Sequence, residues 1–193
     1  AIFSAQHGHI KGHLRTFNEL DEIDDIHLCA VEGGELEEIT ALSSKVVSGT
    51  RDLEEFLSRD EIDFVLVCAR NDISSDILQK CVDAGKHFMF EKPGAMNAND
   101  LRKVAEAAEI KQLTTGVMFQ NRWRPEVREV KQARINGDFG SIMTTETRLA
   151  TSQVRFRNPD GWMFKKDTAG TGILAWLACH HIDMISYLLD DRI

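Results

Sequence analysis

The segment FVLVCARNDISSDILQKCVDAGKHFMF, residues 64–90, decides the fold class. FVLVCA (residues 64–69) is a continuous apolar run, and such runs are typical of strands buried on both faces of a parallel sheet. A helix is expected next, with Ser74 or Ser75 as its N-cap and Gly85 at its end. HFMF then predicts a second buried strand. Strand, helix and strand in this order predict a parallel βαβ unit.

The same alternation continues in both directions along the chain. Three further strands are expected, at residues 2–5, 26–31 and 113–119. Further helices are expected at residues 10–20, 35–45 and 52–58, and from Asn99 or Asp100 onward. This pattern predicts the α/β class, with an N-terminal Rossmann-type, doubly wound parallel sheet. A ligand should bind beyond the carboxyl ends of the strands, at the switch point of the sheet.

The character of the sequence changes after the last of these strands. Pro125 opens a helix to about residue 136, and residues 141–150 alternate as a half-solvated strand does. Residues 173–189 are apolar on most faces, which predicts a buried helix. One strand and one helix do not make a stable domain. We therefore expect a Rossmann domain at residues 1–121 and the incomplete beginning of an α+β, open-sheet domain at residues 122–193.

Composition limits the function classes. The 193 residues include 23 basic and 31 acidic side chains, for a formal charge of −8, which disfavours nucleic-acid binding. No apolar run approaches the roughly 20 residues that span a bilayer, so no membrane association is expected. The four cysteines lack CxxC spacing and are expected to be reduced thiols of a cytoplasmic protein. The chain begins without Met, so the sequence leaves open whether a targeting segment lies upstream.

The first strand-to-helix turn is a degraded dinucleotide fingerprint. In a G-x-G-x-x-G pattern, Gln6, Gly8 and Lys11 take the glycine positions, and only Gly8 is a glycine. The alternative is an ordinary turn glycine. Glu32 lies 24 residues beyond Gly8, at the end of the second predicted strand, where a carboxylate binds the adenine ribose. An acid there repels a 2′-phosphate, which favours NAD over NADP; a solvated loop carboxylate is the alternative.

Two further positions carry candidate chemistry. Pro93 favours an extended conformation at Lys92, which would direct the ammonium into the crevice as a proton carrier; a surface lysine in a tight turn is the alternative. Trp176, His180 and Asp183 are spaced i, i+4, i+7 and should share one helix face. The alternative for His180 is a histidine that is packed in the core and has no role in chemistry.

A metal site is a rival hypothesis for the histidines. His7, His9 and His13 cluster near the first turn, and His180 and His181 near the last helix. The chain has no H-E-x-x-H, and the first cluster lies where a pyrophosphate should bind. No metal is therefore expected.

Four segments together resemble the glucose–fructose oxidoreductase / inositol dehydrogenase / MocA family. The hallmark is AGKHFMFEKPGAMNANDLRKVAEAAE (residues 84–109), which contains Glu-Lys-Pro. CARNDISSDI matches at Asn71, and VMFQNRWRP matches at Arg122 and Pro125. AGTGILAWLACHHID matches at Gly170, Gly172, His180 and Asp183.

The resemblance implies an NAD(P)-dependent oxidoreductase that acts on a sugar, a cyclitol or a related polyol. Lys92 and His180 would be catalytic, flanking the substrate hydroxyl. Cofactor contacts are expected from Gln6, His7, Gly8, His9, Ile10, Glu32, Ala69, Arg70, Asn71, Glu91 and Lys92. Substrate contacts are expected from Arg122, Trp162, Trp176, His180 and Asp183. The second domain implies a homo-oligomer, a dimer or tetramer formed through its sheet.

The departures from the family pattern keep two alternatives open. Besides the degraded fingerprint, Arg70 replaces a proline and Ser74 a histidine. Trp176 stands where many members carry an aspartate, and it would stack on a sugar or fill the pocket. These changes leave open a catalytically inactive nucleotide-binding module. An NAD-dependent glycoside hydrolase is the other alternative, because some relatives hydrolyse glycosides through a transient oxidation.

Overall fold

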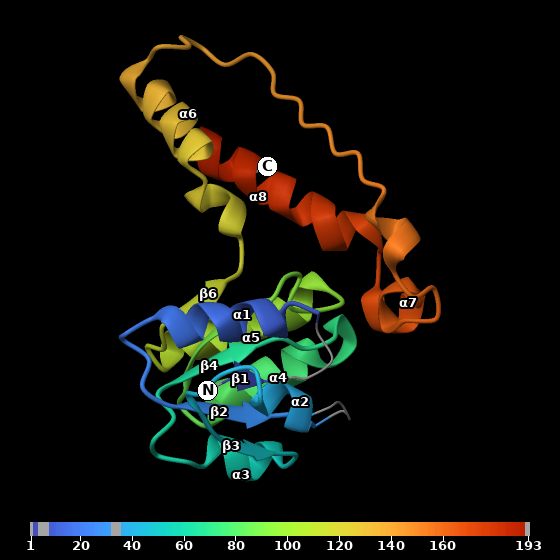
Figure 1. Cartoon of the computed structure of the whole chain (residues 1–193). Helices are drawn as coiled ribbons and strands as arrows, with labels where there is room; N and C mark the ends of the chain where they lie inside the picture. Colours follow the sequence, from blue (N-terminus) through green and yellow to red (C-terminus); the bar gives the residue numbers. More distant parts are fainter. Residues whose placement is uncertain (1, 4–7, 32–35, 192–193) are drawn as a thin grey trace. The chain divides into compact units, whose positions relative to one another are not determined.

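A computed structural model describes residues 2–3, 8–31 and 36–191 (Figure 1). Its contacts divide the chain into two compact units, Ala1–Val117 and Met118–Ile193. The first unit holds a parallel sheet in the order β3-β2-β1-β4-β5-β6. Its strands are β1 (Ile2–Phe3), β2 (Ile26–Cys29), β3 (Val46–Thr50), β4 (Phe64–Val67), β5 (His87–Phe90) and β6 (Thr115–Val117). This is the strand order of doubly wound dinucleotide-binding folds, so the predicted fold class is confirmed.

Helices connect successive strands of this sheet. They are α1 (Ile10–Glu19), α2 (Leu36–Thr40), α3 (Leu53–Leu57), α4 (Asn71–Asp83) and α5 (Ala98–Ile110). Val65, Val67 and Phe88 pack in one core cluster with buried side chains of α3, α4 and α5. Leu66 alternates with them along β4 and is also buried, so it faces the opposite side of the sheet. Right-handed crossovers place α1 and α2 on that side.

Strand β3 was not predicted from the sequence. It is VVSGT at the edge of the sheet, where its residues alternate between half-buried and exposed. Because every second residue of β3 is exposed, the strand lacks the continuous apolar run that reveals the central strands. Two predicted helix starts were also wrong: α4 begins at Asn71 after the N-cap Arg70, and α5 begins after the N-cap Asn97.

The second unit is largely helical. It contains α6 (Pro125–Asn136), α7 (Lys166–Ala169) and α8 (Cys179–Leu189), with a π-helical turn, η4 (Leu174–Ala178), directly before α8. Short 3₁₀ turns are η1 (Gln120–Trp123), η2 (Gln153–Phe156) and η3 (Trp162–Phe164). Helix α6 has the predicted bounds and packs against α8.

Two predictions for this unit were wrong. Residues 141–150 form no strand; they are mostly exposed, and no described strand pairs with them. The apolar helix at the end of the chain is also not a buried one. Only His180 and Asp183 are buried in α8, whereas Ile182 is half exposed.

The last helical stretch also bears on the expectation that no segment could span a membrane. Within Lys166–Leu189, an 18-residue window reaches a mean hydropathy of 1.3 and is 11% buried, so the stretch meets the length and composition of a spanning helix. A single segment of this kind is weak evidence. It also carries the two buried polar side chains, His180 and Asp183, which is typical of a helix inside a folded domain.

Candidate active site

The carboxyl ends of β1 and β4 define the candidate cofactor site in the first unit. These strands are neighbours in the sheet, and their following helices lie on opposite faces. In doubly wound sheets the ligand crevice lies beyond such strand ends. The segments at this edge of the sheet are the start of α1, the loop before α4 and the loop after β5 (Figure 1).

The start of α1 leaves room for a ligand. Gly8 is exposed, and a Cβ added to it would meet nothing within 4 Å among the described residues. Ile10 is buried and anchors the first turn in the core. The backbone amides of a first helical turn have no partner within their helix and attract anions. The predicted cofactor contacts Gln6, His7 and Glu32 lie outside the described residues.

The loop after β4 is held by local contacts. Ala69 and Asn71 are buried at the start of α4. Arg70 donates two hydrogen bonds to Asp72, from Nε to Oδ1 at 3.0 Å and from a terminal nitrogen to Oδ2 at 2.9 Å. The guanidinium that was predicted to contact a cofactor is thus bound to a carboxylate in its own helix.

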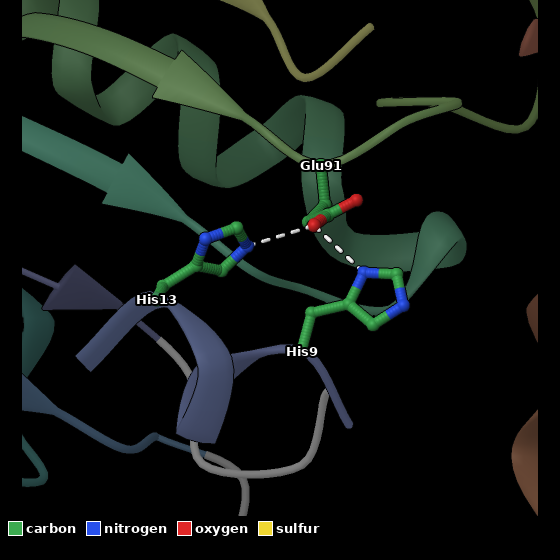
Figure 2. Close-up of side chains that lie close together, drawn as sticks. All are labelled: His9, His13 and Glu91. Carbon is green, nitrogen blue, oxygen red and sulfur yellow. Dashed lines mark hydrogen bonds and ion pairs between the residues drawn. The ribbon is translucent and has the colours of Figure 1, made fainter. Parts of the chain in front are cut away.

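Glu91 and Lys92 are both buried at the end of β5, with 5% and 3% of their surface exposed. Lysine is almost never fully buried unless it is paired, and a lysine in an ordinary surface turn would be solvated. Glu91 Oε1 accepts hydrogen bonds from two imidazoles of α1, His9 Nδ1 at 2.8 Å and His13 Nε2 at 2.9 Å (Figure 2). The α1 helix is therefore tied directly to the residue that precedes Lys92.

Gly94 fixes the path of the chain directly after Lys92. The Lys92–Pro93 peptide is cis, and Gly94 has φ +80°. A Cβ at Gly94 would lie 2.2 Å from the ring of Phe90, the last residue of β5. Only glycine allows both this conformation and this approach, so Gly94 shapes the turn that carries Lys92.

In the second unit, two of the predicted substrate residues bind one another. Arg122 donates from Nε to Asp183 Oδ2 at 2.7 Å and from a terminal nitrogen to Oδ1. The Asp183 side chain is 6% exposed and that of Arg122 42%. These hydrogen bonds raise the pKa of the Arg122 guanidinium above its ordinary value. The pair joins η1 to α8 and therefore holds these two elements together.

His180 and Trp176 lie in successive helical segments and differ in burial. Trp176 lies in the π-helical turn, whereas His180 begins the buried stripe of α8 that also contains Asp183. A π-helical turn closes its hydrogen bonds from i to i+5, so residues four positions apart still lie on nearly the same side of the helix. Such turns are frequent at functional sites.

The rings of these two residues have different neighbours. His180 packs edge-on against Phe119, with ring centroids 5.8 Å apart. The guanidinium of Arg157 lies 4.3 Å from the Trp176 ring centroid, a cation–π contact. Trp176 and Arg157 also line a cavity of about 110 Å³ with apolar side chains of the same unit. Trp162, the other tryptophan predicted to contact substrate, lies in η3 and is not among the residues that line this cavity.

Sequence reasoning missed several partners in these contacts. Arg157 against Trp176, Phe119 against His180, and the bonds from His9 and His13 to Glu91 had no signal in the sequence. Each pair is far apart along the chain, and no local pattern specifies which distant side chain it meets.

The six-stranded parallel sheet, in this strand order and with an open helix start at its switch point, defines a dinucleotide-binding protein of the Rossmann class. Residues 8–119 match the model of the oxidoreductase family with an NAD-binding Rossmann fold, GFO/IDH/MocA. Residues 127–193 match the C-terminal domain of the same family. The chain belongs to the GFO/IDH/MocA oxidoreductase family, as its motifs predicted.

Individual relatives place the chain within this family. It is 29% identical over 145 residues to levoglucosan dehydrogenase of Pseudarthrobacter phenanthrenivorans, which covers 75% of the chain and 37% of the relative. It is 26% identical over 171 residues to scyllo-inositol 2-dehydrogenase (NADP(+)) IolW of Bacillus subtilis, with 88% and 46% coverage. The chain therefore spans less than half the length of these curated relatives.

A solved structure supports the same fold. Levoglucosan dehydrogenase in complex with NADH and L-sorbose superposes with a TM-score of 0.77 at 21% identity, covering 97% of this chain and 51% of that one. At this identity the likeness demonstrates the fold alone.

Proposed function

We propose that the chain is the cofactor-binding part, and the beginning of the substrate-binding part, of an NAD(P)-dependent oxidoreductase acting on a sugar, cyclitol or related polyol. The observation that carries this proposal is the buried Lys92 at the end of β5, in a sheet of dinucleotide-binding order. Relatives that are dehydrogenases of levoglucosan and scyllo-inositol support the substrate class. We place the boundary between the two domains at residues 121 and 122.

The described residues fit a dinucleotide at the switch point. The open space at Gly8 lets a pyrophosphate approach the backbone, and the first amides of α1 favour its negative charge. When bound, the nicotinamide would supply the hydride acceptor or donor. Lys92 would carry the proton of the substrate hydroxyl, because burial is the setting in which enzymes use lysine as a proton carrier. His180 would be the second proton-carrying group.

Substitution of the lysine tests this assignment. Lys92→Met in the intact protein should lower turnover of a polyol substrate by a factor of roughly 10² to 10⁴, the usual contribution of a positioned acid–base group. NADH affinity, read by nicotinamide fluorescence, should change much less. Lys103→Met is the matched control, because Lys103 is 75% exposed on α5. Normal turnover of folded Lys92→Met would leave Lys92 as a turn residue and favour an inactive nucleotide-binding module.

Cofactor preference is the second part of the proposal. Glu32 would bind the adenine ribose hydroxyls and repel a 2′-phosphate, so NADH should bind more tightly than NADPH. The expected discrimination is about 1–3 kcal/mol, the cost of an unpaired or repelled buried group. Comparison of the two dissociation constants, with Glu32→Ser as the variant that relaxes the preference, tests it. Equal or tighter NADPH binding by the unsubstituted protein would refute this role.

We further propose a cytoplasmic homo-oligomer, a dimer or tetramer assembled through the second domain. Support comes from the family match over residues 127–193 and from exposed apolar side chains such as Leu174 in that unit. Light scattering of the intact protein tests the assembly, and a monomeric mass would contradict it.

A further inference from the structure

Three metal-ligating side chains converge at the start of α1. His9 Nδ1, His13 Nε2 and a carboxylate oxygen of Glu91 all lie within 4.8 Å of one another. Figure 2 shows the two imidazoles approaching one end of the same carboxylate from two sides. The sequence raised His9 and His13 as candidates in a rival metal hypothesis, which was set aside because a pyrophosphate was expected here, and it did not include Glu91 among the ligands.

The backbone arranges the two histidines in the way that zinc-binding helices do. His9 and His13 are spaced i, i+4, and His9 already has the right-handed helical conformation, with φ −83° and ψ −15°. Both imidazoles therefore lie on one face of α1. Two histidines at this spacing, with a carboxylate from another segment, form the His₂Glu ligand set of many zinc sites.

The distances are compatible with an ion between the three atoms. Ligand atoms about 2.0–2.2 Å from a tetrahedral zinc ion stand roughly 3.4 Å apart. The two nitrogen–oxygen distances are now 2.8 and 2.9 Å, so each pair needs to open by about half an ångström. The His9 side chain is 45% exposed, which gives it freedom to move and gives an ion a path of entry.

A cation here would take over a role that the two imidazoles have in this structure. The Glu91 side chain is only 4% exposed, and a buried carboxylate requires compensation, which the hydrogen bonds from His9 and His13 now supply and a bound cation would supply in their place. Two nitrogen ligands select a zinc-type ion, because Mg²⁺ and Ca²⁺ prefer oxygen ligands.

We propose that His9, His13 and Glu91 form a binding site for a zinc-type divalent cation, with its remaining coordination position open to solvent at the start of α1. The alternative is a hydrogen-bonded His–Glu–His contact that joins α1 to β5 and binds no ion. The proposal does not depend on the proposed oxidoreductase function, because direct metal binding tests it.

The test uses the intact chain, purified without a histidine tag and stripped with a chelating resin. Zn²⁺ is titrated by calorimetry, and Co²⁺ absorption in the visible range reports the coordination geometry. One equivalent of Zn²⁺ should bind, and Mg²⁺ at the same concentration should give no heat. His9→Ala and His13→Ala should weaken Zn²⁺ binding by about 10-fold or more, because loss of even an outer-shell partner costs 10–100-fold.

His87→Ala is the matched control, since His87 is an exposed histidine at the start of β5 and should leave the affinity unchanged. Circular dichroism checks the fold of each variant. His9→Ala decides the test even if variants at the buried positions fail to fold, because its side chain is half exposed. Absence of Zn²⁺ binding in the unsubstituted chain, or equal affinity in His9→Ala and His87→Ala, would overturn the proposal.

Discussion

Arg122 binds both carboxylate oxygens of Asp183, although 61 positions separate the two residues in the sequence. The carboxylate is buried and the guanidinium is partly solvated. The guanidinium also lies 5.5 Å from the ring centroid of Tyr187, one turn further along α8. Arg122 and Asp183, which the family motifs suggested as substrate contacts, therefore stabilise the second unit by binding each other.

Arg122→Met should lower the free energy of unfolding by about 2 kcal/mol, because it leaves a carboxylate buried without its partner. Urea denaturation measures this change. Asp183→Asn in the Arg122→Met background should recover part of the loss, since no buried charge remains. Arg124→Met is the control, as Arg124 is exposed. Equal stability of the Arg122 and Arg124 variants would contradict a structural role for the pair.

Gly94→Ala should be more destabilising than Gly85→Ala. Both glycines have positive φ, +80° and +69°, so both substitutions cost about 1–2 kcal/mol of backbone strain. Only at Gly94 would the new Cβ also collide with the ring of Phe90, whereas Gly85 faces open space. We expect an additional loss of roughly 1–3 kcal/mol at Gly94 from this overpacking. Thermal unfolding compares the two variants, and equal losses would show that the ring moves aside freely.

Protonation of His27 should destabilise the first unit at mildly acid pH. Burial lowers the pKa of His27 below 6.5, and Arg59 donates to its Nδ1 at 3.1 Å. The unfolded chain then binds a proton more readily than the folded chain. Stability is therefore fully present above pH 6.5 and decreases as the pH falls through and below that value.

Urea denaturation at several pH values measures this dependence. His27→Gln should show a flatter decrease in stability below pH 6.5, whereas His87→Gln, at an exposed position, should retain the original slope. An unchanged slope in His27→Gln would assign the acid sensitivity to other groups.

Three of the four free thiols should be unreactive in the folded protein. Burial raises the pKa of Cys29 and Cys81 to about 12, and it also raises that of Cys68. Cys179 is half buried, and a thiol reagent should modify it first. In the folded chain, one equivalent of thiol should therefore react quickly with the reagent, and the other three should react only on unfolding. Cys179→Ser should abolish the fast phase; fast release of more than one equivalent would contradict this.

The same pKa shifts have a consequence at alkaline pH. A raised thiol pKa means that the folded state holds its protons more tightly than the unfolded state. Stability should therefore decrease as the pH rises from 9 towards about 12.

The sequence by itself determined the α/β class, the central strands and the family. FVLVCA is apolar throughout and HFMF is apolar after the exposed His87, because the buried parts of central strands have no solvent side, and this signal is local. The Glu-Lys-Pro segment and the start of α6 at Pro125 are local signals of the same kind. Where burial is one-sided, as in β3 at the edge of the sheet, the local signal is too weak.

The tertiary structure alone decided which side chains meet. Glu91 contacts His9 and His13 across about 80 positions, and Arg122 contacts Asp183 across 61. Trp176 packs against Arg157 and His180 against Phe119, and the spacing of Trp176 and His180 indicated neither partner. Residues 141–150 alternate like a strand yet pair with none of the described strands. In each case the outcome depends on contacts with distant segments, and a local pattern does not encode those contacts.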